Sequence, residues 1–228
     1  MKISIITLFP EVFEPILHSS ILKRAQAKGK IEFELINLRD FGEGKHQVVD
    51  DRPYGGGAGM VLKADILTKA LKKVMVGKLK THVILTSASG TPYKQSRARQ
   101  LSKLDNIIIV CGHYEGVDQR FIDKYISEEI SIGDYILTGG EIPTMVIIDS
   151  IVRLIPGVLK KPEAIVNESF SDYTLLEEPQ YTRPKEFEKA KVPAVLLSGN
   201  HGEITKWRKE KSREKTKKIR PDLIIQRD

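Results

Sequence analysis

An apolar run broken by glycines, IGDYILTGG (132–140), has the residues to hold a small ligand. Glycine within a strand-like run indicates a bulge or a close approach of the backbone to another group. The three glycines are Gly133, Gly139 and Gly140. In such a loop, main-chain groups can bind an adenine-like ring while neighbouring Ile and Leu side chains form apolar walls. A bend in a sheet explains the same pattern, so this run alone leaves two interpretations open.

A second group of polar residues, CGHYEGVDQR (111–120), directly follows the apolar stretch NIIIVCG (106–112). In parallel α/β sheets, ligands bind beyond the carboxyl ends of the strands. Gly112, Tyr114 and Glu115 occupy that place in the sequence. An ordinary strand-to-helix turn is the alternative interpretation.

The stretch DDRPYGGGAGM (50–60) contains four glycines in the five positions 55–59. Such a loop can bring backbone N–H groups close to an anion. It lacks the Gly-Lys-Ser/Thr ending of a phosphate-binding loop, and no G-x-G-x-x-G fits it, which disfavours a nucleotide hydrolase. Asp50, Asp51 and Arg52 stand beside the glycines. These charges favour a mobile lid over a polar substrate rather than a simple flexible turn.

Several classes of protein are disfavoured because their motifs are missing. The chain has no H-E-x-x-H, C-x-x-C or G-x-S-x-G, and its five histidines are scattered. The single cysteine, Cys111, excludes an internal disulfide and a multi-thiolate metal site. No apolar stretch approaches the roughly 20 residues that span a bilayer, and the N-terminal residues lack the long apolar core of a signal peptide. We therefore predict a cytoplasmic protein with no membrane contact and no assigned metal ligands.

The positive charge of the chain is concentrated near its C-terminus. The formal net charge is +7, from 37 Lys and Arg against 30 Asp and Glu. Residues 181–228 contain 14 Lys and Arg but only 7 Asp and Glu, which leaves 23 of each in residues 1–180. A neutral body with a basic C-terminal part is typical of proteins that bind a polyanion. A solvated helix face with chance asymmetry is the alternative.

The hydrophobic pattern predicts an α/β fold with a mainly parallel sheet. Ile- and Val-rich strands are predicted at 2–9, 31–38, 82–86 and 106–112. Helical patterns alternate with them near 11–28, 64–75 and 94–103, as in parallel α/β proteins. A further, largely buried helix is predicted over 141–155, with Pro143 in its first turn.

The periodic pattern fades after residue 160, and this predicts the domain organisation. Residues 1–160 are predicted to form the α/β domain and 161–180 an interdomain loop. Residues 181–228 are predicted to form a small, basic, helical domain, with a helix at 203–219.

Together, these stretches resemble the bacterial tRNA (guanine-N1)-methyltransferase family of the SPOUT superfamily. The resemblance covers essentially the whole chain, and its motifs occur in the family's order. They are LFPEVF, LRDF, VDDRPYGGGAGM, CGHYEGVDQR, EEISIGDYILTGGEIPTMVIIDS, RLIPGVL, ESF, YTRP, VPAVLLSGNH and RPDL.

The resemblance implies properties that the residue pattern does not predict by itself. It implies that the α/β domain contains a deep trefoil knot, an arrangement that connection rules make very rare. It implies an obligate homodimer with active sites at the subunit interface and a C-terminal domain that binds tRNA. The implied reaction transfers a methyl group from S-adenosylmethionine to N1 of the guanosine immediately 3′ of the anticodon, after a preferred preceding guanosine. The family also implies Mg²⁺, for which Glu115 is the one candidate ligand.

The chemistry of this reaction requires two functional groups. N1 of guanine carries a proton at neutral pH, so methyl transfer needs a base. Negative charge then grows on O6, which needs a cation or a strong hydrogen-bond donor. The resemblance assigns the O6 role to Arg153 and the base to Glu168, where the family commonly has aspartate. Glutamate keeps the carboxylate and adds one methylene; Asp172 is a weaker candidate.

The resemblance also assigns the binding residues. The cofactor contacts are Gly112, Ile132, Gly133, Asp134, Tyr135, Ile136 and Leu137, with Tyr114, Glu115, Gly139 and Gly140 nearby. The substrate contacts are Asp50, Arg52 and Gly59.

Two further departures from the family pattern concern the binding region. His113 stands where arginine is common, and Ser87-Ala88-Ser89 replaces a usual Ser-Pro-Gln. Together with Glu168, His113 motivates an alternative hypothesis: an RNA-binding protein that kept the fold and lost catalysis.

Overall fold

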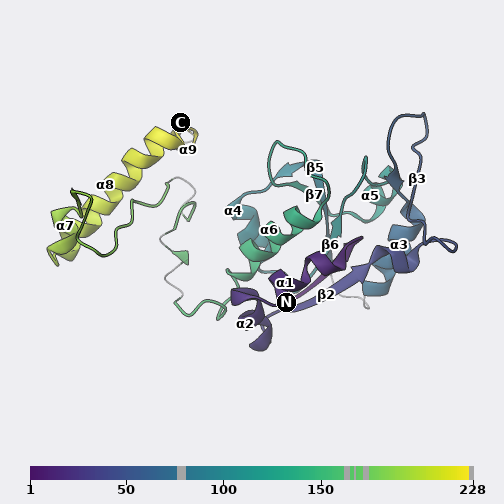
Figure 1. Ribbon diagram of the computed structural model, residues 1–228, viewed down its shortest axis with the longest axis horizontal. Helices are drawn as coiled ribbons and strands as arrows, with labels where there is room; N and C mark the ends of the chain where they lie inside the picture. Colours follow the sequence, from purple (N-terminus) through teal and green to yellow (C-terminus); the bar gives the residue numbers. More distant parts are fainter. Residues whose placement is uncertain (76–80, 162–164, 167, 172–174, 226–228) are drawn as a thin grey trace. The chain divides into compact units, whose positions relative to one another are not determined.

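The computed structural model describes residues 1–75, 81–161, 165–166, 168–171 and 175–225 (Figure 1). The chain divides into two compact units, Met1–Lys160 and Lys161–Asp228.

The first unit is built on a five-stranded sheet in which every strand pair is parallel. Its strands, in spatial order, are β2 (Glu32–Asn37), β1 (Lys2–Thr7), β6 (Asn106–Cys111), β5 (His82–Pro92) and β7 (Glu128–Ser131). The predicted α/β fold with a mainly parallel sheet is therefore confirmed, and the four predicted strands correspond to β1, β2, β5 and β6. In the central strand, Ile109 pairs with Ile5 on one side and Ile84 on the other.

Helices cover both faces of this sheet, which explains why its central strands are apolar on both faces. One core packs the sheet against α1 (Glu14–Leu17), α2 (Ser20–Ala27), α4 (Gln95–Leu101) and α6 (Glu141–Val152). The other packs it against η2 (Leu38–Phe41), α3 (Ala64–Val74) and α5 (Gln119–Tyr125). Figure 1 shows α6 and α3 over different parts of the sheet. The helices predicted at 64–75, 94–103 and 141–155 are confirmed as α3, α4 and α6, although α6 ends three residues early. The helical segment predicted near 11–28 is divided into three short helices, η1 (Pro10–Val12), α1 and α2.

The run 132–140 lies outside the sheet, so its strand-like interpretation is wrong. β7 ends at Ser131, and the run continues as an irregular loop to the start of α6 at Glu141. One isolated bridge joins Gly139 to His113. The preceding strand β7 escaped prediction because half of its four residues are glutamates, Glu128 and Glu129.

The glycine-rich loop is closed by a short antiparallel pair, β3 (Asp50–Asp51) with β4 (Val61–Leu62). This pair is fixed to the segment after β6: the N–H of Glu115 donates to the Met60 carbonyl at 3.0 Å, and that of Leu62 to the Gly116 carbonyl at 3.0 Å. Gly55, Gly56, Gly57 and Gly59 have φ between +82° and +122°, a region that favours glycine.

The second unit is centred on α8 (His201–Ile219), which confirms the helix predicted at 203–219. Its other elements are β8 (Glu186–Phe187), β9 (Ala190–Lys191), α7 (Ala194–Leu197) and α9 (Asp222–Ile225). Asn200 caps α8 by accepting from the N–H groups of Gly202 and Glu203. None of the helices within the described ranges is long and apolar enough to cross a membrane.

Part of the predicted interdomain loop packs on α8 through polar contacts. Ser212 donates to the Leu176 carbonyl at 2.6 Å, and the Leu176 N–H donates to Thr216 Oγ1 at 2.8 Å. Lys215 donates to the Glu177 carbonyl at 2.9 Å. These contacts explain why Ser212 and Thr216 are buried on an otherwise polar helix.

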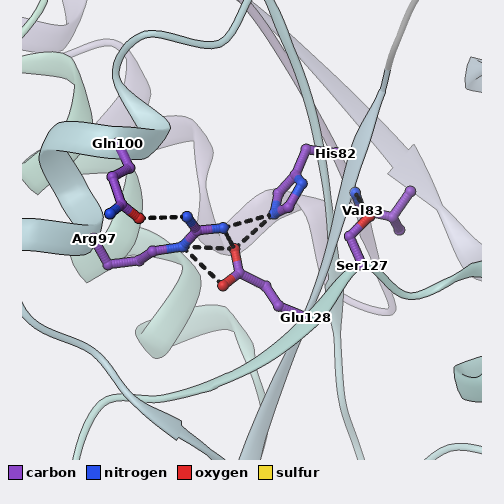
Figure 2. A network of polar contacts seen from close by, with 6 residues as sticks. All are labelled: His82, Val83, Arg97, Gln100, Ser127 and Glu128. Atoms are coloured by element: carbon purple, nitrogen blue, oxygen red, sulfur yellow. Dashed lines mark hydrogen bonds and ion pairs between the residues drawn. The ribbon is translucent and has the colours of Figure 1, made fainter.

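A network of polar contacts fastens the edge strand β7 to the amino end of β5 (Figure 2). The Arg97 guanidinium lies 2.6 Å from Oε1 and 2.9 Å from Oε2 of Glu128, and His82 Nε2 lies 2.7 Å from Oε1. Arg97 also donates to Gln100 at 2.6 Å. Burial alone would raise the pKa of Glu128, but the hydrogen bonds from His82 and Arg97 outweigh it and hold this pKa below its ordinary value.

Glu128→Gln should destabilise the protein at neutral pH and matter less in acid. We expect the free energy of unfolding to fall by about 1.5–3 kcal/mol at pH 7, the range for hydrogen bonds to charged groups. Because the folded-state pKa of Glu128 is lowered from 4.5, the contribution is fully present well above that pH and is lost as the pH falls through the lower, folded-state pKa. A urea unfolding series from about pH 7 down to about pH 3 measures both effects.

The matched control is Glu14→Gln, which breaks an ion pair between exposed side chains, Glu14 and His18. Exposed pairs contribute little, so a change within about 0.5 kcal/mol is expected. Equal stability of Glu128→Gln and the parent protein at pH 7 would contradict the assignment.

Candidate functional site

A cavity of about 500 Å³ opens at the carboxyl ends of β5, β6 and β7. It is lined by residues 85–89, 112–117, 119, 122, 129–133, 135–140 and 143. Three segments thus converge: the end of β5, the turn after β6, and the loop after β7. This is the place at which parallel α/β sheets bind ligands, and the volume suits a small molecule.

The end of β5 reaches the cavity because its ladder with β7 is interrupted. Thr86 and Thr91 both pair with Ile130, so the residues between them form a bulge. Ser87, Ala88 and Ser89 belong to this bulge and line the cavity. The bulge therefore brings residues 87–89 to the cavity, whereas a regular strand would keep them paired within the sheet.

Ten of the eleven predicted cofactor residues line this cavity. They are Gly112, Tyr114, Glu115, Ile132, Gly133, Tyr135, Ile136, Leu137, Gly139 and Gly140. The structure does not place Asp134 among the lining residues. The stretches 111–120 and 132–140, separate in sequence, therefore form one site.

Thr86 joins the three segments at the floor of the site. Its Oγ1 lies 3.3 Å from the carbonyl oxygens of Val110 and Gly140, and accepts from the Gly112 N–H at 3.4 Å. The Gly140 N–H donates to the Gly112 carbonyl at 2.8 Å. A Cβ on Gly140 would overlap Thr86 Oγ1 and lie 2.6 Å from the Gly112 nitrogen, and a Cβ on Gly112 would lie 2.7 Å from the Thr86 carbonyl oxygen. Only glycines allow these backbones to meet.

A buried carboxylate lies beside this junction. Glu141, the first residue of α6, has Oε2 2.7 Å from His113 Nε2, and its Oε1 accepts from the Thr7 hydroxyl at 2.6 Å. Thr7 in turn accepts from the Phe9 N–H at 3.0 Å. The His113 ring also packs edge-on against Phe9, with centroids 5.3 Å apart. These contacts connect β1, the turn after β6, and α6.

The ionisation of the buried groups follows from these contacts. Burial would raise the pKa of Glu141, but the hydrogen bonds from His113 and Thr7 outweigh it and hold the pKa below its ordinary value. Burial raises the pKa of the Cys111 thiol far above its ordinary value. Cys111 therefore stays protonated and is unsuited to act as a nucleophile.

Two of the three predicted substrate residues of the 50–60 loop, Gly59 and Asp50, contact side chains that line the cavity, although no residue of this loop lines the cavity itself. A Cβ on Gly59 would overlap the Glu115 side chain, so the two residues are in close contact. Burial and the neighbouring Asp50 carboxylate, which forms a hydrogen bond with its hydroxyl, raise the pKa of Tyr114. Arg52 is exposed and does not line the cavity.

Comparison with known proteins decides the family. The family model described as tRNA (Guanine-1)-methyltransferase TrmD matches residues 1–226. The chain belongs to this family. Three bacterial relatives, each named tRNA (guanine-N(1)-)-methyltransferase, are similar over nearly their whole length. The protein of Dictyoglomus turgidum is 52% identical over 98% of this chain and 90% of its own. That of Bacillus pumilus is 50% identical over 98% and 92%, and that of Clostridioides difficile is 51% identical over 98% and 97%.

In this tRNA (Guanine-1)-methyltransferase family member, Arg153, one of the two residues predicted to carry catalysis, does not line the cavity of the first unit. Arg153 caps the carboxyl end of α6, while Glu141 at its other end lies near the cavity. At 1.5 Å per residue the helix separates them by about 18 Å. Glu168 belongs to the second unit, where it lines a hollow with Ser171 and Arg208. Asp172 lies outside the described residues.

The described residues offer no ready ligand set for a metal ion. Within them, no three His, Cys, Asp or Glu side chains gather in a way that could hold one. Glu115, the candidate Mg²⁺ ligand, lines the cavity next to Gly59 without such companions.

Sequence reasoning did not assign Thr7, Thr86 and Glu141 to the site. Thr7 and Glu141 are 134 residues apart, so no local pattern links them. A carboxylate directly after Gly139-Gly140, at the head of a largely apolar helix, was the available signal for Glu141. His113, one of the five scattered histidines, is paired with Glu141.

Gly140→Ala tests whether the site depends on the backbone junction. The φ of −84° and ψ of −2° at this position suit any residue, so the lack of space alone opposes a side chain. Overpacking should lower the free energy of unfolding by about 1–3 kcal/mol, measured by urea unfolding. The control is Gly202→Ala in α8, where the nearest atom to a Cβ is Asn200 Oδ1 at 3.5 Å. It should be neutral or stabilising, and equal effects of the two substitutions would refute the argument.

Proposed function

We propose that this protein transfers a methyl group from S-adenosylmethionine to N1 of the guanosine immediately 3′ of the tRNA anticodon. One observation carries the proposal: in a member of the tRNA (Guanine-1)-methyltransferase family, the loop 132–140 and the turn 112–117 form one cavity beyond the parallel strands. The names of the relatives support the more general activity, methylation of guanine N1 in tRNA, without the methyl donor or the position in the tRNA.

The residues present fit S-adenosylmethionine. Ile132, Ile136 and Leu137 line the cavity and can flank an adenine ring. The absence of side chains at Gly112 and Gly140 keeps the backbone close to any bound group. When bound, the cofactor would supply the methyl group from its positively charged sulfur, which would keep the electrons of the broken carbon–sulfur bond and leave as a neutral thioether. A buried, hydrogen-bonded Glu141 at the start of α6 keeps the floor of the cavity rigid.

Two side chains complete the proposed mechanism. Glu168 accepts the N1 proton of the guanine, and N1 can then form its bond to the methyl carbon. Arg153 donates to O6, where the negative charge of the deprotonated base gathers. We assign no residue to Mg²⁺, because the described carboxylates do not gather around Glu115.

We further propose that the protein acts as a homodimer with sites at the subunit interface. Arg153 lies about 18 Å along α6 from the end near the cavity, so a second copy is needed to supply it there. Ile136, Ile142 and Val146 are 83%, 55% and 44% exposed beside the cavity and on α6. Apolar exposure of this kind is typical of protein interfaces. The expected trefoil knot is also part of the proposal and rests on family membership.

The second unit is proposed to bind the tRNA. α8 contains eight Lys and Arg against three Glu, and most of its residues are exposed. Such a surface binds a phosphate backbone by releasing its counterions.

The activity is tested with labelled S-adenosylmethionine and unmodified tRNA that carries two guanosines at the proposed site. We expect label in N1-methylguanosine, identified by nuclease digestion and mass spectrometry, and none when adenosine replaces the second guanosine. If a folded protein binds this tRNA but transfers no label, the RNA-binding protein without catalysis becomes the correct description.

Glu168→Gln tests the base. The amide has a similar shape but cannot accept the proton, so the rate of methyl transfer at saturating substrates should fall by about 10²- to 10⁴-fold. Binding of S-adenosylmethionine, measured by calorimetry, should be unchanged. Glu188→Gln, on an exposed turn of the same unit, is the matched control and should keep full activity. A Glu168→Gln rate close to that of the parent protein would rule out this role.

A further inference from the structure

The second unit contains a hollow that the proposed chemistry does not use. Its volume is about 870 Å³, and all of its lining residues lie between 178 and 208. We call it the Trp207 hollow and define it by Tyr181, Arg183, Lys185, Leu196, Trp207 and Arg208. Trp207 projects from α8, while Tyr181 precedes the β8–β9 hairpin.

Two aromatic rings form one wall of the Trp207 hollow. The ring centroids of Tyr181 and Trp207 are 6.2 Å apart, and their planes meet at 56°. A flat molecule stacked on one ring therefore meets the other obliquely, an arrangement that aromatic groups favour. Tyr181 is 48% exposed, so this wall is open to a ligand. Pro179, Leu196 and Ile204 add apolar surface.

Positive charge surrounds this apolar wall. Arg183 and Lys185 are exposed, and neither has a carboxylate partner in the part of the chain that the structure describes. Arg208 is held by Glu178, with its Nε 3.3 Å from Oε1. The hollow thus combines stacking surfaces with two cations, Arg183 and Lys185, that no carboxylate of the described residues neutralises.

We propose that the Trp207 hollow binds an unpaired nucleobase of the RNA substrate. The base stacks on the Trp207 or Tyr181 ring, and Arg183 and Lys185 bind the flanking phosphates. Aromatic rings beside cations are how proteins hold single-stranded nucleotides, since every base has a face that stacks. The inference rests on the proposed function only in taking RNA as the substrate.

Charge distinguishes this occupant from a second copy of the chain. A self-association face would bring Arg183 and Lys185 of two basic units close together, on a unit whose α8 is also strongly basic. A polyanion removes this repulsion, and a base supplies the flat apolar group that the wall accommodates.

Trp207 is the single tryptophan of the chain, so its fluorescence reports on the hollow alone. The full-length protein is titrated with unmodified tRNA in the absence of S-adenosylmethionine. We expect saturable quenching of Trp207 emission, because a stacked base quenches indole. A fully paired RNA duplex of similar length should bind through its phosphates without this quenching. Absence of quenching at tRNA saturation, with binding confirmed by filter retention, would overturn the proposal.

Substitutions separate stacking from simple packing. Trp207→Leu keeps an apolar side chain but has no stacking face, and should weaken tRNA binding by about 5- to 100-fold, as expected for loss of one base–aromatic contact. Trp207→Phe should stay within about threefold of the parent protein. Phe187→Leu makes the same kind of change at an exposed ring outside the hollow, and should leave both the tRNA affinity and the quenching of Trp207 unchanged. Circular dichroism confirms the fold of each variant.

The outcomes distinguish this inference from the proposed function. If tRNA quenches the emission of Trp207 and tRNA binding depends on this side chain, yet no methyl group is transferred, the proposed hollow is supported and the proposed catalysis is refuted. A protein that methylates tRNA while Trp207→Leu binds it with parent affinity refutes the hollow alone. If Trp207→Leu changes the sedimentation coefficient and not tRNA binding, the hollow is a self-association surface and the proposal is wrong.

Discussion

The contact between the backbones at Gly112 and Gly140, with Thr86 beside them, is the constraint on which the site depends. The Gly140 N–H donates to the Gly112 carbonyl at 2.8 Å, and Thr86 Oγ1 lies within 3.4 Å of polar backbone atoms of both residues. This contact sets the start of α6 against the ends of β5 and β6. A side chain at either glycine would push these elements apart, and the cavity they enclose would lose its floor.

The same contact makes the burial of Glu141 possible. The carboxylate follows Gly140 directly, so the junction carries it into the interior, where an unpaired charge would be costly. His113 and Thr7 satisfy its two oxygens, and His113 itself lines the cavity. The position of His113 in the cavity wall is therefore coupled through Glu141 to Thr7 of β1, a strand that does not itself line the cavity.

The sequence predicted the elements well where their signal is local, and less well where it is not. β1 and β6 are apolar on both faces, a pattern typical of strands in a parallel sheet that is covered by helices on each side. The loop 132–140 was harder, because its apolar residues face a cavity and mimic a strand. The Thr7–Glu141 contact could not be predicted, since only the folded sheet brings these residues together. The assignment of Arg153 and Glu168 came from the family resemblance, not from any pattern in the chain.

The division of the chain gives the proposed reaction a physical source of selectivity. Arg153 lies at the far end of α6 from the cavity, and Glu168 belongs to the second unit, so the first unit by itself holds the cavity without the proposed base. Under the proposed mechanism, deprotonation of N1 requires Glu168 and charge stabilisation requires Arg153, and both must act on the same guanine. In the proposed homodimer, such an active site is complete only when a second copy supplies Arg153 and the RNA supplies the guanine. The methyl donor is then exposed to a base only in the presence of the substrate it should modify, because assembly and recognition are the same event.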